Sequence, residues 1–179
     1  GNAEGTMAYV EEHNLLLFPR AEDKNKKNLY TLSQELSIIS SVEGLKANID
    51  TAALFLDEHI YFGTANPSLK NCQTPINEDC GIVVKSTIEG DIVSELGLEQ
   101  GYRAWLVGSP VSDGEHIYIT TAKQAYGEVG VYDFEAEEYR YGCSILKLDK
   151  DLNIIAYDDP DQAGCTKSTN KLLAVATGE

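Results

Sequence analysis

The sequence predicts an all-β chain that is built from repeated four-stranded antiparallel units. Three observations predict this class: a tetrapeptide that occurs twice, a hairpin-like block that occurs three times, and weak helical periodicity along the whole chain. The chain has 179 residues, of which 42% are hydrophobic, so it is long enough and apolar enough to bury a core as one domain.

The second strand of each predicted unit is marked by the tetrapeptide Glu-His-Ile-Tyr, at residues 58–61 and again at residues 115–118. Both copies lead into a short β-prone run that ends in Thr-Ala. Equivalent runs lie at residues 15–18 and 172–177. We therefore expect one strand pattern to recur along the chain.

A hairpin-like block follows the first three of these strands. It occupies residues 29–39, 83–93 and 145–155, and the three copies align without gaps. Each copy has an apolar stretch, about four turn-like residues and two β-branched residues, which is typical of two strands joined by a tight turn. Gly90 with Asp91, and Asn153, are residue types that tolerate the positive φ of such a turn.

Each unit is completed by a candidate first strand, at residues 7–10, 52–56 and 109–112. The second strands begin at Leu15, Ile60 and Ile117, so successive units are 45 and 57 residues apart. Four short antiparallel strands at this spacing predict β-propeller blades. One such sheet carries apolar residues on both faces, and stacking blades around an axis covers them.

The repeated segments resemble the PQQ-like, or quinoprotein-type, β-propeller repeat. The resemblance rests on the runs at residues 60–65 and 117–122 and on Leu-Asp-Lys-Asp-Leu-Asn-Ile-Ile at residues 148–155. It implies the propeller fold for most of the chain.

The chain departs from this family both at a docking residue of the repeat and at residues that would carry the family's chemistry. The tryptophan that ends the outer strand in the family is absent, Leu96 and Tyr157 standing nearest, and the single tryptophan, Trp105, lies between units. The adjacent cysteines that some quinone enzymes carry are also absent from the sequence. We therefore expect no cofactor.

The predicted architecture is an incomplete ring, with units at about residues 6–50, 51–107 and 108–163 and a partial unit at 164–179. A closed propeller has four to eight blades. The chain is then a fragment of a longer propeller, one chain of a two-chain propeller, or a protomer that completes its ring by self-association. Its partners would be the remaining blades of the same precursor, a second chain or a second copy.

The composition excludes several kinds of partner. With 29 acidic and 14 basic residues, the formal net charge is −15, which disfavours nucleic acid and anionic membrane surfaces. No apolar run approaches the ~18 residues that cross a bilayer, so membrane insertion is not expected.

The four cysteines indicate an oxidising compartment, and hence a secreted, periplasmic or cell-surface protein. None lies in a Cys-x-x-Cys pair, which disfavours a metal site. Three disulfide pairings are possible, of which we favour Cys72–Cys80 with Cys143–Cys165, and free buried thiols are the alternative.

Two connections between second and third strands stand out. Residues 21–28 are polar and include three lysines, so we expect a solvated turn there. Residues 123–142 are the most unusual connection, because tyrosine and phenylalanine alternate with acidic residues. Such aromatic rings favour a protein-binding surface. The alternative is an extra hairpin at residues 129–134 that packs the aromatic residues on the blade. The candidate partner-binding residues are Tyr126, Tyr132, Phe134, Tyr139 and Tyr141.

Two other groups are expected to be structural. Residues 149–153 resemble the start of a calcium loop but lack its later glycine and glutamate, so a hairpin turn is favoured, and Asp158, Asp159 and Asp161 are only weak cation candidates. His13, His59 and His116 all fall at the turn between the first and second strands of their units. No catalytic residue is predicted, because no motif for nucleophilic, phosphate or zinc chemistry occurs.

The sequence therefore favours a non-catalytic, extracytoplasmic propeller segment that serves as an interaction or structural module. The first alternative is part of a PQQ-dependent dehydrogenase whose site another segment completes. The second alternative is a glycan-binding surface protein.

Overall fold

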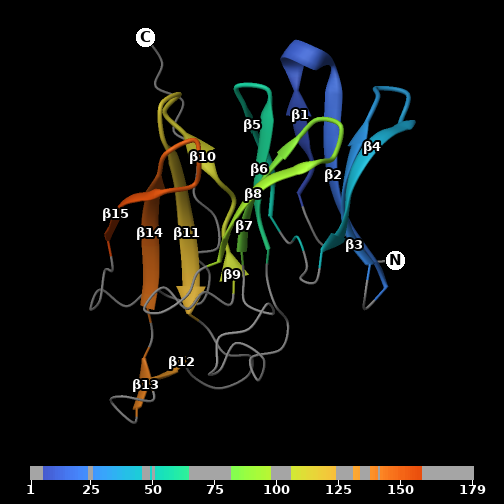
Figure 1. Ribbon diagram of the computed structural model, residues 1–179. Coiled ribbons are helices and arrows are strands. Elements are labelled where there is room, and N and C mark those ends of the chain that lie inside the picture. The colour runs from blue at the N-terminus through green and yellow to red at the C-terminus, as the bar shows by residue number, and fades with distance from the viewer. Residues whose placement is uncertain are drawn as a thin grey trace.

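The computed structural model describes residues 6–23, 26–45, 49, 51–64, 82–97, 106–123, 131–133, 138–140 and 142–158. Within these residues the chain forms three antiparallel sheets that stand side by side, and a separate two-stranded hairpin (Figure 1). This arrangement confirms the predicted all-β class.

The first sheet contains β1 (Ala8–Val10), β2 (Leu15–Asp23), β3 (Lys26–Leu32) and β4 (Ile38–Leu45) in sequence order. A single turn of 3-10 helix, η1 (Glu11–His13), joins β1 to β2 and ends at Asn14, whose left-handed backbone turns the chain back. The second sheet repeats the order with β5 (Leu54–Leu56), β6 (His59–Gly63), β7 (Ile82–Thr87) and β8 (Ile92–Gly97).

The third sheet contains β10 (Val111–Ser112), β11 (Ile117–Lys123), β14 (Gly142–Leu148) and β15 (Ile154–Asp158). A further strand, β9 (Leu106–Val107), pairs with the far end of β11. The predicted first strand at residues 109–112 is therefore shorter than expected, since β10 covers only its last two residues. Pro110 lies between β9 and β10, and proline has no N–H to donate to a ladder.

The second and third sheets pair their middle strands in the same register, as the repeat predicts. Tyr61 of the first Glu-His-Ile-Tyr segment pairs with Lys85, and Tyr118 of the second segment pairs with Lys147. The two tetrapeptides therefore lie at equivalent points of neighbouring sheets, as predicted.

The core consists of two layers that fill the spaces between sheets. The layer between the first and second sheets includes Leu17, Leu29 and Val42 on one side and Ile60 and Phe62 on the other. The second layer joins the second sheet to the third. Its fully buried members are Tyr61, Val83, Ile117, Ile119, Leu146 and Leu148. Each sheet thus uses its neighbour to cover an apolar face.

The predicted polar turn at residues 21–28 is wrong for most of its length. β2 continues to Asp23 and β3 begins at Lys26, with Arg20 opposite Asn28 and Ala21 opposite Lys27. A polar sequence is compatible with a hairpin, because the ladder that joins its strands is made by the backbone.

The turns between the third and fourth strands, at residues 33–37, 87–91 and 149–153, are built alike, and we name them the hairpin turns. In each, the first and fifth residues share a backbone hydrogen bond, as do the first and fourth. The fourth residue is left-handed in all three, at Leu36 (φ 63°), Gly90 (φ 98°) and Leu152 (φ 67°). The hairpin prediction is confirmed, but in the third turn Leu152 takes the position expected of Asn153.

Candidate functional site

The hairpin turns make the most consistent contacts between sheets, because each of the last two reaches the sheet before it. In the β7–β8 turn, the carbonyl oxygen of Ile88 accepts hydrogen bonds from the hydroxyls of Thr31, at 3.5 Å, and Ser40. A Cβ on Gly90 would lie 2.2 Å from the carbonyl oxygen of Ser41. Glycine is therefore required at this close approach.

The β14–β15 turn meets the second sheet in the same way. The Tyr61 hydroxyl donates to the carbonyl oxygen of Lys150, which stands where Ile88 does in the turn before, at 2.9 Å. The Lys85 Nζ lies 2.9 Å from Asp151 Oδ1. Leu152 is buried in the core layer between the two sheets. One hydroxyl, one ammonium group and an apolar surface thus hold the turn.

The Lys85–Asp151 pair is asymmetric, because the Lys85 side chain is 9% exposed and the Asp151 side chain 80% exposed. Burial lowers the pKa of Lys85, but the Asp151 carboxylate and the Tyr61 hydroxyl outweigh it and raise that pKa above its usual value. The pKa of Tyr61 is raised, chiefly by burial. The ammonium group therefore stays charged and is directed at the neighbouring turn.

We call the tyrosine and the lysine that hold a hairpin turn, here Tyr61 and Lys85, the receptor. The third sheet carries a second copy of this receptor. Lys147 Nζ lies 5.8 Å from the centre of the Tyr118 ring, and Lys85 Nζ lies 5.9 Å from that of Tyr61. Among the described residues, no hairpin turn lies on the copy. The Tyr118 hydroxyl instead donates to Asp113 Oδ2 at 2.8 Å.

The Asp113 carboxylate is strongly stabilised in its charged form. The backbone N–H of His116 is the largest cause, followed by the Tyr118 hydroxyl and the backbone N–H of Glu115, and together they hold the pKa of Asp113 well below its usual range. The Tyr118 hydroxyl thus donates its hydrogen bond to Asp113, whereas the equivalent Tyr61 hydroxyl in the second sheet donates to a turn carbonyl.

The β5–β6 turn contacts both neighbouring sheets. Its residues Asp57 and Glu58 are both left-handed. The Asp57 carboxylate pairs with Lys150 of the third sheet, and Glu58 Oε1 lies 3.3 Å from His13 Nε2 at the end of η1. The His13 ring also meets Phe55 edge-on, with ring centres 5.1 Å apart.

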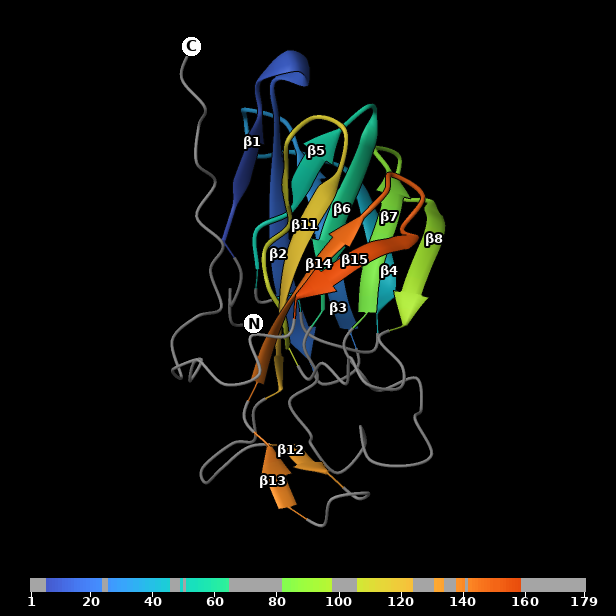
Figure 2. The same ribbon diagram turned by 90° about the vertical axis from the view of Figure 1, so that its left-hand side faces the viewer.

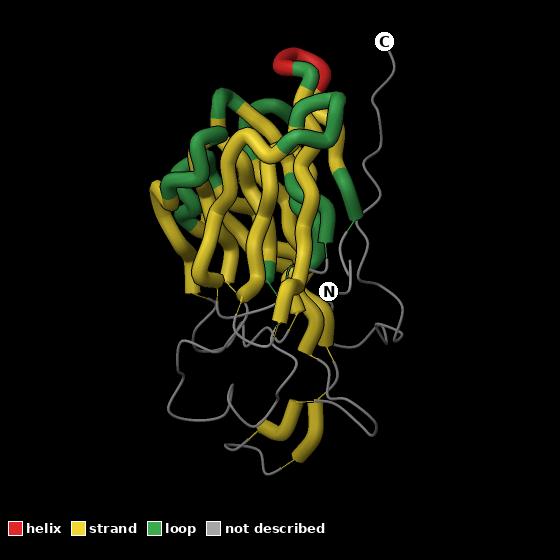
Figure 3. Tube along the Cα trace, turned by 90° about the vertical axis from the view of Figure 1, so that its right-hand side faces the viewer, coloured by secondary structure: helices red, strands yellow, loops and turns green. Residues whose placement is uncertain are grey.

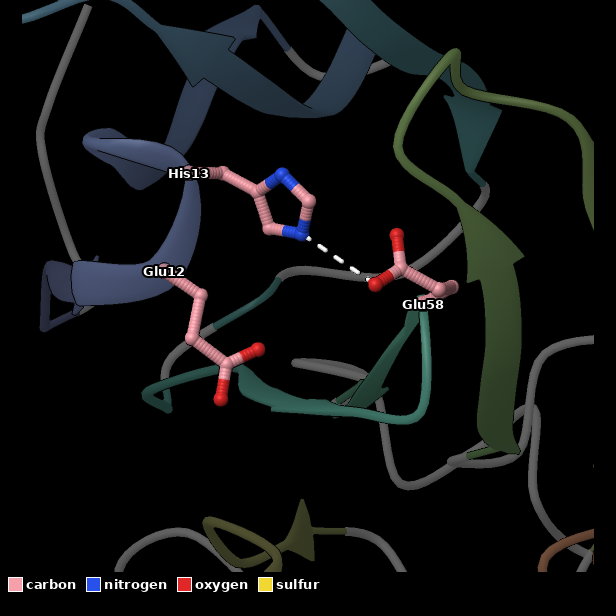
Figure 4. A group of neighbouring side chains, drawn as sticks. All are labelled: Glu12, His13 and Glu58. Carbon is pink, nitrogen blue, oxygen red and sulfur yellow. Dashed lines mark hydrogen bonds and ion pairs between the residues drawn. The ribbon is translucent and has the colours of Figure 1, made fainter.

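Glu12, His13 and Glu58 form the group best able to hold a cation among the described residues (Figure 4). Their ligand atoms lie within 4.8 Å of one another, and imidazole with two carboxylates suits a divalent ion. All three side chains are exposed. The one contact within the group, between His13 and Glu58, joins the first sheet to the second. We therefore interpret the group as a contact between sheets.

The predicted aromatic segment contains a hairpin, of which the structure describes the backbone. β12 (Val131–Asp133) pairs with β13 (Glu138–Arg140), with Tyr132 opposite Tyr139. The hairpin lies beyond the ends of β11 and β14, on the side away from the hairpin turns (Figures 1 and 2). Tyr126, Phe134 and Tyr141 lie outside the described residues.

The other predicted site residues are placed only in part. Cys143 lies in β14 and Asp158 ends β15. Cys72, Cys80, Cys165, Asp159 and Asp161 lie outside the described residues, so the disulfide and cation predictions are not tested.

The three histidines fall at the turn between first and second strands, as predicted: His13 ends η1, His59 begins β6 and His116 precedes β11. Their contacts differ. His59 Nδ1 lies 2.7 Å from the carbonyl oxygen of Asp57, whereas His13 contacts the next sheet.

Sequence reasoning missed the receptor residues Tyr61, Lys85, Tyr118 and Lys147. A signal was present, because Lys85 and Lys147 share one column of the gap-free alignment and each tyrosine ends a Glu-His-Ile-Tyr segment. The spacing alone did not show that the pair faces the next unit.

The stacked four-stranded sheets define a β-propeller-type fold whose ring is not closed within the described residues. No family of known proteins and no curated protein matches the chain. The chain is similar in structure to BamB from Moraxella catarrhalis, with a TM-score of 0.54 and 12% sequence identity over 87% of this chain. The match spans 36% of the BamB chain. In the described part of the chain, no helix has the length and apolar character needed to cross a membrane.

Proposed function

We propose that this chain is a non-catalytic, extracytoplasmic interaction module that forms one part of a larger propeller. The observation that carries the proposal is the receptor on the third sheet. Tyr118 and Lys147 repeat the pair that binds a hairpin turn inside the stack, at the end of the stack where no described turn is bound. A face built to bind another sheet is an interaction surface.

A second surface follows the outer strands. The two β-branched residues that begin each fourth strand are all exposed, from 36% to 63%, at equivalent places in the three sheets. Contiguous exposed apolar patches are typical of protein contacts, and we propose that these side chains form one along the outer strands. The six residues are Ile38, Ile39, Ile92, Val93, Ile154 and Ile155.

The hairpin β12–β13 is the third surface of the proposal. It brings Tyr132 and Tyr139 opposite each other and carries Asp133 and Glu138 beside them. Together with Tyr126, Phe134 and Tyr141, these residues would bind a partner protein. The alternative glycan-binding function is tested by comparing wild type, Y132A and Y139A on a glycan array. This alternative requires that the wild-type chain binds a glycan and that each substitution abolishes the binding.

The outer-strand surface is tested by photocrosslinking. A photoreactive residue in place of Ile92 or Ile154 is expected to crosslink to a protein partner in extract. Glu95 is the matched control position, because it is also exposed and lies on β8 with Ile92. Equal crosslinking from Glu95 would show that the outer strands bind nothing specific.

The dehydrogenase alternative is tested with added cofactor. The chain is mixed with PQQ and calcium, and the quinone absorbance and dye-linked alcohol oxidation are measured. The proposal predicts neither a cofactor band bound to protein nor oxidation above that of free PQQ. Saturable binding with turnover would establish the alternative and overturn the non-catalytic function.

The extracytoplasmic location is proposed from the four cysteines. Intact mass after alkylation without reductant tests it. Two disulfides leave no cysteine alkylated, and four alkylated cysteines would contradict both the pairing and the compartment.

A further inference from the structure

The two ends of the described stack are complementary to each other. At one end, the third sheet presents Tyr118 and Lys147, the copy of the pair that holds a hairpin turn inside the stack. At the other end, the first sheet presents the hairpin turn at residues 33–37, which contacts no earlier sheet among the described residues. We propose that this turn of a second copy of the chain docks on Tyr118 and Lys147, so that copies associate head to tail.

The turn of the first sheet has the chemistry that the receptor binds. Its third residue is Glu35, which stands where Asp151 stands in the turn held by Lys85. Its fourth residue is Leu36, which stands where Leu152 enters the core and has the same left-handed backbone. Docking would therefore pair Glu35 with Lys147. It would also direct the carbonyl of Gln34, the second residue of the turn, to the Tyr118 hydroxyl.

The exposure of these groups fits an unfilled contact. Leu36 is 67% exposed, while Leu152 is 4% exposed. Glu35 is exposed, and Tyr118 and Lys147 are only partly buried, whereas Tyr61 and Lys85 are buried. The same kinds of group are therefore covered inside the stack and accessible at its ends.

The strands behind the turn have the same register as those of the third sheet, but their outer face is not open. Leu16 and Phe18 of β2 pair with Leu32 and Tyr30 of β3, in the register in which Ile117 and Ile119 pair with Leu148 and Leu146. The latter four are the residues that the third sheet packs against the second. Leu32 and Tyr30 are only 9% and 8% exposed in the single chain, so this strand face is already largely covered and the turn itself makes the proposed contact.

The partner is a second molecule, because the two ends lie on opposite sides of the described stack. Figure 1 shows the second sheet between the first and the third, and Figure 3 views the molecule from the side of the first sheet. The two surfaces differ, so the contact is heterologous: it closes a ring or continues as a chain of copies.

One part of the receptor must rearrange. In the single chain, Asp113 accepts a hydrogen bond from the Tyr118 hydroxyl. A carbonyl of the docked turn would replace Asp113 as the acceptor. Gln34 takes the place of Lys150, so the charge pair that Lys150 makes with Asp57 has no equivalent. We therefore expect weaker binding than inside the stack.

The inference rests on the proposed function, since it identifies what binds one of the proposed surfaces. It is tested by sedimentation velocity of the full chain, from about 1 to about 200 µM, at low salt. The wild-type chain is expected to associate with rising concentration. E35K and K147E should each weaken association roughly tenfold or more, because each places like charges together.

The two charge variants are then mixed in equal amounts. In the mixture, the lysine introduced by E35K in one chain meets the glutamate introduced by K147E in the other, and the unchanged Glu35 meets the unchanged Lys147. Association should therefore return to the wild-type level. Circular dichroism checks that each variant is folded, and D91K serves as a matched control on the β7–β8 turn, whose exposed Asp91 has no part in this contact.

Three results would overturn the inference: a wild-type chain that stays monomeric, single variants that associate like wild type, or a mixture no better than either variant. The first would leave residues 159–179 or a following blade of a longer chain as the occupant. The cofactor assay is independent of the charge variants, so failure of the non-catalytic function is distinguished from failure of self-association.

Discussion

Leu36 and Leu152 occupy the same left-handed position of equivalent hairpin turns, but Leu36 is 67% exposed and Leu152 is 4% exposed. The backbone of the turn is therefore independent of what lies beside it. The difference comes from the neighbouring sheet: the second sheet covers Leu152, and among the described residues no sheet precedes Leu36.

Alanine at these two positions measures what the neighbouring sheet contributes. L152A is expected to lower the free energy of unfolding by about 2–4 kcal/mol, as for other buried leucines. L36A should change it by less than about 0.5 kcal/mol in dilute protein. Both variants keep the left-handed backbone, so the difference between their urea unfolding midpoints reports burial. Equal effects would contradict the packing of the turn on the second sheet.

Gly90 is expected to tolerate no side chain. G90A directs a Cβ at the carbonyl of Ser41 and also strains a backbone with φ of 98°. G114A is the matched control, because its φ is 94° and nothing lies within 4 Å of its Cβ. G114A should cost about 1 kcal/mol from backbone strain, and G90A clearly more. Thermal unfolding of the two variants compares them, and equal losses would show that the β7–β8 turn is not pressed against β4.

Lys85 is expected to destabilise the folded chain when its partner Asp151 is removed. D151A leaves an almost buried ammonium group without its carboxylate and should cost about 1–2 kcal/mol. K85M removes the charge and keeps the apolar stem, so it should cost less. The double variant should be more stable than D151A alone. A double variant whose loss equals the sum of the single losses would mean that the two side chains do not interact.

Asp149 should make the third hairpin turn sensitive to acid. Its carboxylate accepts the backbone N–H groups of Asp151 and Asn153 and the side-chain amide of Asn153. The side chain of Asn153 is the largest cause of a lowered pKa. A carboxyl whose pKa falls on folding adds stability above its unfolded value of 3.8, and this stability is lost as the pH falls through the folded value.

D149A therefore should lose most stability near neutral pH, with a loss that shrinks below about pH 4. D149N is the control that keeps one acceptor oxygen and should retain part of the turn. Unfolding measured from pH 3 to pH 7 gives both curves. A loss for D149A that does not vary over this range would exclude the charged carboxylate as the source.

The repeat allowed much of the fold to be predicted. The gap-free alignment of residues 29–39, 83–93 and 145–155 located all three hairpin turns, because the backbone bonds and the left-handed fourth residue recur in the same columns. It could not show whether Leu36 or Leu152 is buried. The two are chemically identical, and only the neighbouring sheet distinguishes them.

The receptor could be recognised only from the structure. Lys85 and Asp151 are 66 residues apart, and an alignment of repeats relates equivalent residues rather than residues in contact. The sequence also predicted a solvated turn at residues 21–28, because polar side chains do not reveal the backbone ladder that joins β2 and β3. The binding role of Tyr132 and Tyr139 remains a prediction, although their hairpin is present.

Each sheet depends on its neighbour to cover its apolar face, and amide hydrogen exchange of wild type and L152A tests this dependence most directly. We expect L152A to speed exchange on both sides of the core layer, in β6 and β7 of the second sheet as well as in β11 and β14, while β2 and β3 change less. Faster exchange confined to β14 and β15 would contradict the dependence, because it would show that the third sheet unfolds without affecting the sheet on which it packs.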